Sequence, residues 1–265
     1  MLENGYIPIS NGQMILSLIL VLITGLVSMF LKLGLLKSLA WGTVRAFVQL
    51  MLIGYLLTFI FQLNNPAVII AIILLMSFIA SREATRRITR TPFNPTFLSF
   101  ITLTASTFLV GIIVVAIIIS PEPWYEARIM IPIFGMILGN SMNAVALALD
   151  RMYSEVYAHV DEVEQMLCFG ATPWEASRAY IRRAVQAGMT PTINSLMVVG
   201  LVSLPGMMTG QILAGMDPRE AVRYQFVVMI MIAAAVAIAC LLIVGLTYKK
   251  MFNDEMALAE SITNK

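Results

Sequence analysis

The chain has 265 residues, of which 59% are hydrophobic and only 12% are charged, and its formal net charge is +2. A soluble domain carries about 25% charged residues, so half of the usual water-facing surface is missing and a single soluble core is a poor explanation. In nucleic-acid-binding proteins basic residues cluster with aromatic ones, and the basic residues of this chain do not. We therefore expect a lipid bilayer, and no nucleic acid, as a partner.

The first feature along the chain is a series of long apolar runs. A helix needs about 20 apolar residues to cross a bilayer. Pro205 and Gly206 interrupt the sixth run, and the third is short before it meets Arg82. The sequence predicts an all-α, polytopic transmembrane bundle of about seven spans that forms a single domain over residues 1–265. The predicted spans are 12–31, 39–61, 66–81, 97–119, 128–149, 192–213 and 225–247.

The loops between these runs differ strongly in positive charge. In a seven-span arrangement fourteen Lys and Arg residues fall on one side, and only Arg128, Arg219 and Arg223 fall on the other. Positive loops remain in the cytoplasm. The bias predicts a multi-pass protein with its N-terminus outside and its C-terminus inside the cell.

The longest connection, residues 150–191, has the pattern of two helices. Apolar residues recur at helical spacing from Val156 to Leu167, and we expect the acidic residues among them to face water. Gly170 predicts the end of this first helix. The acidic residues expected on the other face of this first helix are Glu155, Asp161, Glu162 and Glu164.

The second helix of this connection begins with a clear signal. Thr172 is the expected N-cap, Pro173 the first helical residue and Glu175 the third, which completes a capping box. We expect Gly188 and Pro191 to end this helix near residue 187. The pair is either a connector lying on the membrane surface or a docking element, in which Trp174 would be the anchor.

The turn between these helices resembles the coupling loop of ABC-transporter permeases, which have Glu, then Gly six residues later, often followed by Ala-Thr/Ser-x-Trp. This resemblance implies that the 150–191 segment is a cytoplasmic coupling loop that contacts an ATPase subunit. The matching residues are Glu164, Gly170, Ala171, Thr172, Pro173 and Trp174.

A wider resemblance covers nearly the whole chain. RAFVQL at 45–50, GNSMN at 139–143 and SLPGMMTGQIL at 203–213 are similar to the FetB/YbbM permease family, which includes plant permeases tied to aluminium tolerance. The resemblance implies an ABC-transporter permease in the cell (inner) membrane, working as a homodimer with a separate ATPase, and iron export in bacterial members. Composition and spacing do not themselves indicate iron.

The motif search favours transport over catalysis. The sequence contains no phosphate-binding loop and no set of catalytic residues, so we expect no cofactor in this chain and ATP hydrolysis in a partner chain. Cys168 and Cys240 have no metal-ligand spacing, and His159 is expected on a helix surface. The metal ligands of a transport site are unknown at this stage, and no residue is assigned a catalytic role.

Polar residues inside the apolar runs are the candidates for a transport pathway. Pro205 frees backbone groups within its span, and a broken helix at a cavity is a common transport site. The alternative is that these residues only bond neighbouring helices together. Gly135, Gly139, Gly206 and Gly210 are expected to pack helices. The pathway candidates are Asn140, Asn143, Ser203, Met207, Met208 and Gln211, with Ser203, Met207 and Gln211 expected on one helix face.

Other function classes stay open at this stage. A secondary carrier would ordinarily need ionisable groups within its spans, and the predicted span centres have almost none. A permease for a non-metal solute and a membrane scaffold that recruits a partner are both compatible with the residues.

Overall fold

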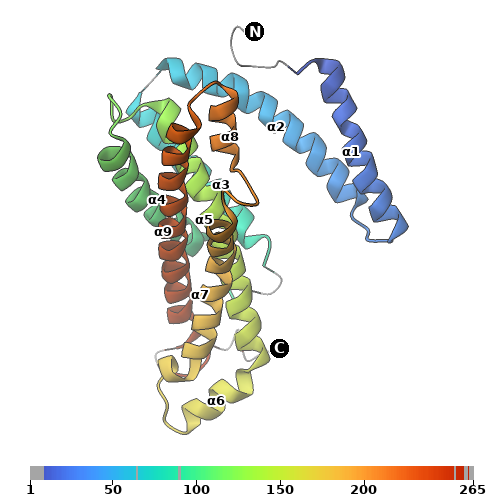
Figure 1. The fold of residues 1–265 in the computed structure, drawn as a ribbon. Helices are drawn as coiled ribbons and strands as arrows, with labels where there is room; N and C mark the ends of the chain where they lie inside the picture. Colours follow the sequence, from blue (N-terminus) through green and yellow to red (C-terminus); the bar gives the residue numbers. More distant parts are fainter. Residues whose placement is uncertain (1–8, 64, 89–90, 254, 260–261, 263–265) are drawn as a thin grey trace.

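The computed structural model describes residues 9–63, 65–88, 91–253, 255–259 and 262. Regular structure in this part of the chain is helical, apart from two isolated bridges (Figure 1). The elements in chain order are α1 (Asn11–Phe30), α2 (Leu36–Leu63), α3 (Pro66–Thr85), α4 (Thr96–Ile112) with its π-helical continuation η1 (Ile113–Ile119), α5 (Ala127–Ala158), α6 (Val160–Cys168), α7 (Pro173–Val198), α8 (Gly206–Leu213) and α9 (Pro218–Met251).

Six of these elements are long and apolar enough to cross a membrane: α1, α2, α3, α4 with η1, α5 and α9. They coincide with six of the seven predicted spans. The remaining stretch, 192–213, is not one helix, because α7 ends at Val198 and α8 begins at Gly206. The connecting turn is closed by a hydrogen bond from the Gly200 N–H to the Ser203 carbonyl (2.9 Å), with Gly200 at a φ of +81°. Pro205 lacks the N–H that a continuous helix would need at this point.

α5 is the centre of the bundle, because it packs against α3, α4, α7 and α9. One apolar cluster includes Leu149, Tyr153 and Ile243 and lies towards the end that carries α6, hereafter the α6 end. A second cluster, around Phe134 and Ile137, fills the opposite half. The pairing of long helices around α5 therefore gives the molecule its rigid body.

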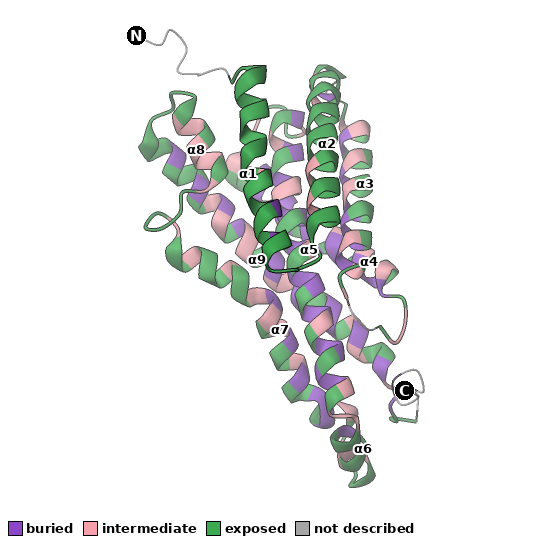
Figure 2. Ribbon diagram, turned by 90° about the vertical axis from the view of Figure 1, so that its right-hand side faces the viewer, coloured by how far each residue is buried: buried purple, intermediate pink, exposed green. Residues whose placement is uncertain are grey.

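The hairpin of α1 and α2 contributes almost nothing to this body. Gly25 and Ser28 are the only buried residues of α1, and Ile60 is the only one of α2. Figure 1 shows the hairpin diverging from the bundle, and Figure 2 shows both helices exposed over nearly their whole length. Within the described chain, most of the apolar side chains of α1 and α2 are exposed.

The predicted boundaries in the 150–191 segment need two corrections. Val156 belongs to α5, which continues to Ala158 before α6 starts, so the first predicted helix is divided at His159. The second helix does not end at Gly188 and Pro191 but runs through both to Val198. Local helix breakers are overridden here because α7 packs along α5 and α9, and tertiary packing outweighs intrinsic propensity.

Gly188 shows why this packing requires a glycine. A Cβ at this position would lie 2.6 Å from the Cys240 Sγ, 2.8 Å from the Ala144 carbonyl oxygen and 3.1 Å from the Ala148 Cβ. The backbones of α5 and α7 thus meet at van der Waals distance beside α9.

Candidate functional site

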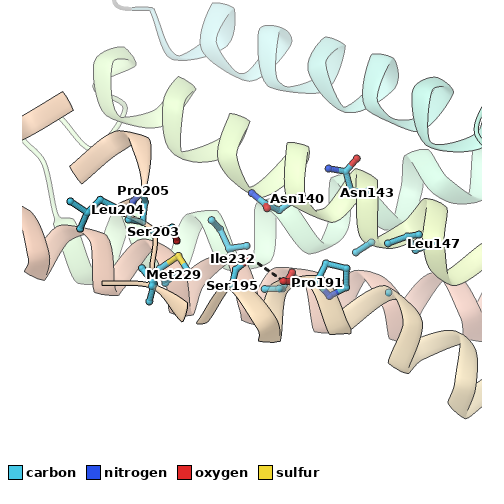
Figure 3. A pocket seen from close by; sticks show the side chains of 14 residues that line it. Asn140, Asn143, Leu147, Pro191, Ser195, Ser203, Leu204, Pro205, Met229 and Ile232 are labelled. Atoms are coloured by element: carbon cyan, nitrogen blue, oxygen red, sulfur yellow. Dashed lines mark hydrogen bonds between the residues drawn. The ribbon is translucent and has the colours of Figure 1, made fainter. Parts of the chain in front are cut away.

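The break between α7 and α8 faces a cavity of about 310 Å³, hereafter the central cavity (Figure 3). α5 supplies Asn140 and Asn143, and α9 supplies two apolar residues. The sequence-predicted association of a broken helix with a cavity is therefore present in the fold. The remaining lining residues are Ala144 and Leu147 of α5, Gly188, Pro191, Thr192 and Ser195 of α7, Val199, Ser203, Leu204 and Pro205 of the break, and Met229 and Ile232 of α9.

The polar side chains of the central cavity are amides and hydroxyls. Asn140 Nδ2 donates to the Met136 carbonyl (2.8 Å), and Ser195 Oγ donates to the Pro191 carbonyl (2.9 Å). The Asn143 Oδ1 accepts a hydrogen bond from Arg87 Nη1 (2.7 Å), which places a guanidinium at the edge of the cavity. Oxygen donors of this kind can replace the water around a hard cation or bind the hydroxyl groups of an organic solute.

The structure divides the six predicted pathway residues among three cavities. Asn140, Asn143 and Ser203 line the central cavity. Met207 and Gln211 line a second cavity of about 400 Å³, and Met208 borders a third one. The expected alignment of Ser203 with Met207 and Gln211 is wrong, because α8 begins only at Gly206 and Ser203 precedes it.

The second cavity lies between α5, α8 and α9, towards the end opposite α6. It also includes Arg128, Met136 and Tyr224. The Gln211 Oε1 is shielded from solvent and has no hydrogen-bond partner within the described part of the chain. A shielded amide oxygen without a partner is uncommon in proteins and is a candidate ligand contact.

Thr192 and Ser195 line the central cavity, although the sequence did not single them out. The expected end of the helix at residue 187 placed them at the start of another span, with no neighbours to suggest a role. One feature of the sequence could have indicated them. Thr192 and Ser195 follow Gly188 by four and seven residues, and this spacing places all three on the same face of a helix.

The four glycines expected to pack helices behave differently from one another. A Cβ on Gly135 would lie 3.3 Å from the Met76 Cε, but within the described chain nothing lies within 4 Å of such a Cβ on Gly139, Gly206 or Gly210. Packing inside one chain is therefore correct only for Gly135 among the four.

The turn between α6 and α7 has the local structure that the sequence predicts. The Thr172 N–H donates to the Glu175 Oε2 (2.8 Å), and the Glu175 N–H donates to the Thr172 Oγ1 (3.3 Å), so the capping box is complete. These backbone and hydroxyl hydrogen bonds hold the pKa of Glu175 below its ordinary value. Pro173 occupies the first helical position, and Gly170 adopts a φ of +89° just after α6. The turn, hereafter the coupling turn (residues 169–172), is thus held by its own hydrogen bonds.

The aromatic residues at the coupling turn are exposed to different degrees. Trp174, the predicted anchor, is 54% exposed, and its ring meets Tyr248 of α9 edge-on at 5.9 Å. Phe169 is 85% exposed and lies at the tip of the turn. Phe169 is therefore the more exposed of the two aromatic side chains, although the sequence alone drew attention to Trp174.

Glu155 departs most from its predicted environment. It was expected to face water but is only 7% exposed, and its carboxylate pairs with Arg183 of α7 (2.8 Å) and with Arg151. His159 is half-buried rather than on a free surface, since its ring stacks on Tyr180 at 5.0 Å. α5 continues straight through this region, so Glu155 faces α7 instead of water. Burial raises the pKa of Tyr180 to about 12.

Several membrane-length helices around a broken helix and a polar cavity define a multi-pass membrane protein of the transporter type. A family model described as Uncharacterised protein family (UPF0014) matches residues 11–252, and the chain belongs to this family.

Named relatives agree with this assignment. The chain is 35% identical over 246 residues to the Probable iron export permease protein FetB of Escherichia coli (strain K12), which covers 93% of both proteins. It is 38% identical over 231 residues to the UPF0014 membrane protein slr1647 of Synechocystis, covering 85% of this chain and 87% of the relative. It is 31% identical over 236 residues to Protein ALUMINUM SENSITIVE 3 of Arabidopsis thaliana, covering 89% and 85%. The FetB-type resemblance seen in the sequence is confirmed, and the chain is a membrane permease. No solved structure matches it.

Proposed function

We propose that this chain is the membrane permease of an ABC transporter and works with a separate ATPase chain. The observation that carries the proposal is the course of α7, a single helix from the coupling turn at Thr172 to the central cavity at Ser195. A rigid helix with one end exposed for a partner and the other at a polar cavity can transmit a displacement between them. In this proposal the α6 end is cytoplasmic, the N-terminus is outside and the protein resides in the cell (inner) membrane.

The buried ion pair supports such transmission. Glu155 of α5 binds Arg183 of α7 about midway between the coupling turn and Ser195. Closure of the ATPase on ATP binding would push the coupling turn, and α7 would then move as one unit with the part of α5 nearest the α6 end. Because the helical structure is interrupted between Val198 and Gly206, the C-terminal end of α7 can shift relative to α8 and change access to the central cavity.

We further propose that two copies of the chain form the pathway. Asn140 and Asn143 are exposed on α5 within a predicted span, and the neighbouring Gly139 is also exposed. Amide side chains are costly against lipid, and small residues permit close contact between helices. A second copy packed against this face would cover the amides and close the open side of the cavity.

Iron or another metal ion is the proposed cargo, exported at the expense of ATP. The name of the relative FetB, an iron export permease, and the oxygen donors in the central cavity support a hard cation. The Arg87 guanidinium beside Asn143 favours a second candidate, a non-metal solute that is anionic or rich in hydroxyls, because a positive charge repels a bare cation.

Transport into inside-out vesicles that contain this chain and its ATPase tests the function. We expect ATP-dependent uptake of iron or another metal in a screen across metals. Uptake of no metal would refute metal export while leaving an ABC permease for another solute, and uptake without ATP or ATPase would favour a secondary carrier.

Coupling is tested separately by co-purification of the ATPase with Gly170→Asp. Gly170 and Gly215 have φ values of +89° and +91°, and no other residue that the structure describes lies where a Cβ would be. Gly215→Asp therefore introduces the same backbone strain at the other end of the molecule. We expect ATPase association to be lost in Gly170→Asp and kept in Gly215→Asp. Equal association of both variants would contradict docking at the coupling turn.

A further inference from the structure

The chain beyond α9 folds back towards the helices instead of leaving them. The Asn253 N–H donates to the Ala257 carbonyl (2.9 Å), and the Asn253 Oδ1 accepts hydrogen bonds from the Glu255 and Ala257 N–H groups (3.1 and 2.8 Å). Leu258 is buried in the apolar cluster at the α6 end. This C-terminal turn, described for residues 252, 253 and 255–259, is therefore anchored both by hydrogen bonds and by burial.

An open groove of about 640 Å³ lies between the coupling turn and the C-terminal turn. Among the described residues that line the groove, one exposed carboxylate lies on each wall, Glu164 on the α6 side and Glu255 on the other. Apolar side chains lie between them, and Met256 is 61% exposed. The lining residues are Glu164, Leu167, Cys168, Gly170 and Ala171 on one side and Glu255, Met256, Ala257 and Leu258 on the other.

We propose that this composite groove is the docking site of the ATPase subunit, so that the C-terminal turn forms half of the interface. The inference rests on the proposed function, and it specifies the partner surface: a Lys or Arg flanked by apolar side chains. The cation would lie between the two carboxylates, while apolar neighbours contact Met256 and the protruding Phe169. An exposed apolar floor with charges at its rim is the usual composition of a protein interface.

Charge selects a basic protein over the other possible occupants. Asp161 and Glu162 add two exposed carboxylates on α6 beside Glu164. These carboxylates would repel an anionic lipid surface from the groove, because the exposed basic residues of the same end lie outside its lining. A symmetric contact of groove with groove would bring like charges together, which is unfavourable.

Cys168 offers a native probe of occupancy. It lines the groove and is exposed, whereas the other cysteine, Cys240, is buried. We would measure the rate at which a charged, membrane-impermeant maleimide modifies the full-length chain, with and without its ATPase. Saturating ATPase should slow modification at least about tenfold, as expected when nine-tenths of the groove is occupied. Cys168→Ser should abolish the signal.

Affinity measurements on variants of the C-terminal turn complete the test. Glu255→Lys and Met256→Asp should each raise the Kd for the ATPase about tenfold or more, and binding by Glu255→Lys should depend less on salt. Glu122→Lys, an exposed charge reversal at the opposite end of the molecule, is the matched control and should bind normally.

The outcomes separate the two levels of the proposal. Unaltered Kd values for both C-terminal variants, together with loss of binding in Gly170→Asp, would overturn the composite groove but keep the permease function. Unchanged Cys168 modification in a complex that does form would also overturn the groove. Failure of the wild-type chain to bind any ATPase would refute the proposed function itself.

Discussion

Replacing Gly188 by alanine should loosen the junction of α5, α7 and α9. The added Cβ would lie 2.6 Å from the Cys240 Sγ and 2.8 Å from the Ala144 carbonyl oxygen. The cysteine sulfur can rotate, but a backbone carbonyl on a packed helix cannot, so α7 must move away from α5. Overpacking of this kind costs about 1–3 kcal/mol.

A second glycine isolates the steric cost from helix propensity. Alanine is about 1 kcal/mol better than glycine in a helix interior, a gain that Gly188→Ala shares with any such substitution. Gly245 lies inside α9, and no other described residue comes within 4 Å of its Cβ position. Gly245→Ala should therefore be stabilised by about 1 kcal/mol, and Gly188→Ala should be less stable than this control by about 1–3 kcal/mol.

Cys240 reports the same loosening directly. In a Cys168→Ser background it is the sole thiol of the chain, and it is buried beside Gly188. We expect Cys240 to be alkylated faster in Gly188→Ala than in Gly245→Ala. The free energy of unfolding in detergent should also be lower for Gly188→Ala than for Gly245→Ala. If Gly188→Ala were as stable as Gly245→Ala and Cys240 no more reactive, the close approach of the helices would be refuted.

Two further predictions concern the α6 end. Thr172→Ala should cost about 1 kcal/mol at the start of α7 and speed hydrogen exchange in its first turn about fivefold, while the rest of α7 exchanges normally. Hydrogen bonding to Thr172 holds the pKa of Glu175 below its ordinary value. The stabilisation by the ionised Glu175 carboxylate is therefore fully present above its unfolded pKa and is lost as the pH falls through its lowered folded pKa. The wild-type chain should show the same fraying in that acidic range. Glu155→Gln should lower the unfolding free energy by about 1.5–3 kcal/mol, since a charged hydrogen bond to Arg183 is lost, whereas Glu220→Gln, which breaks an exposed pair, should cost at most about 1 kcal/mol. Equal effects of these two glutamate variants would contradict a structural role for the buried pair.

Features determined by a few neighbouring residues could be predicted from the sequence. The Thr172 capping box depends on side chains three positions apart, and Pro66 after Asn65 gives the start of α3 in the same way. Long apolar runs are equally local, which is why six predicted spans correspond to membrane-length helices. These elements need no knowledge of what packs against them.

Features determined by distant partners could not be predicted. α7 continues through Gly188 because the glycine fits against Ala144 and Ala148 of another helix, and this fit is invisible in the local sequence. Glu155 looked like a solvated residue until α7 brought Arg183 to it. Ser203 and Gln211 separated into different cavities because the chain turns between Gly200 and Pro205, and a projection on one helix cannot represent that turn.

The glycines without neighbours bear on the assembly. A glycine in a helix interior costs about 1 kcal/mol relative to alanine, and where an added Cβ would meet no other described residue, packing within the monomer does not offset this cost. Gly139 is such a residue, and it adjoins Asn140, whose exposed amide would be unfavourable in lipid. Both costs disappear if another helix lies against this face of α5, with the glycine admitting its backbone and the amide facing a shared pathway. Gly139→Leu should accordingly weaken self-association of the purified chain while leaving its monomer folded, and an unchanged dimer fraction would exclude this face from the interface.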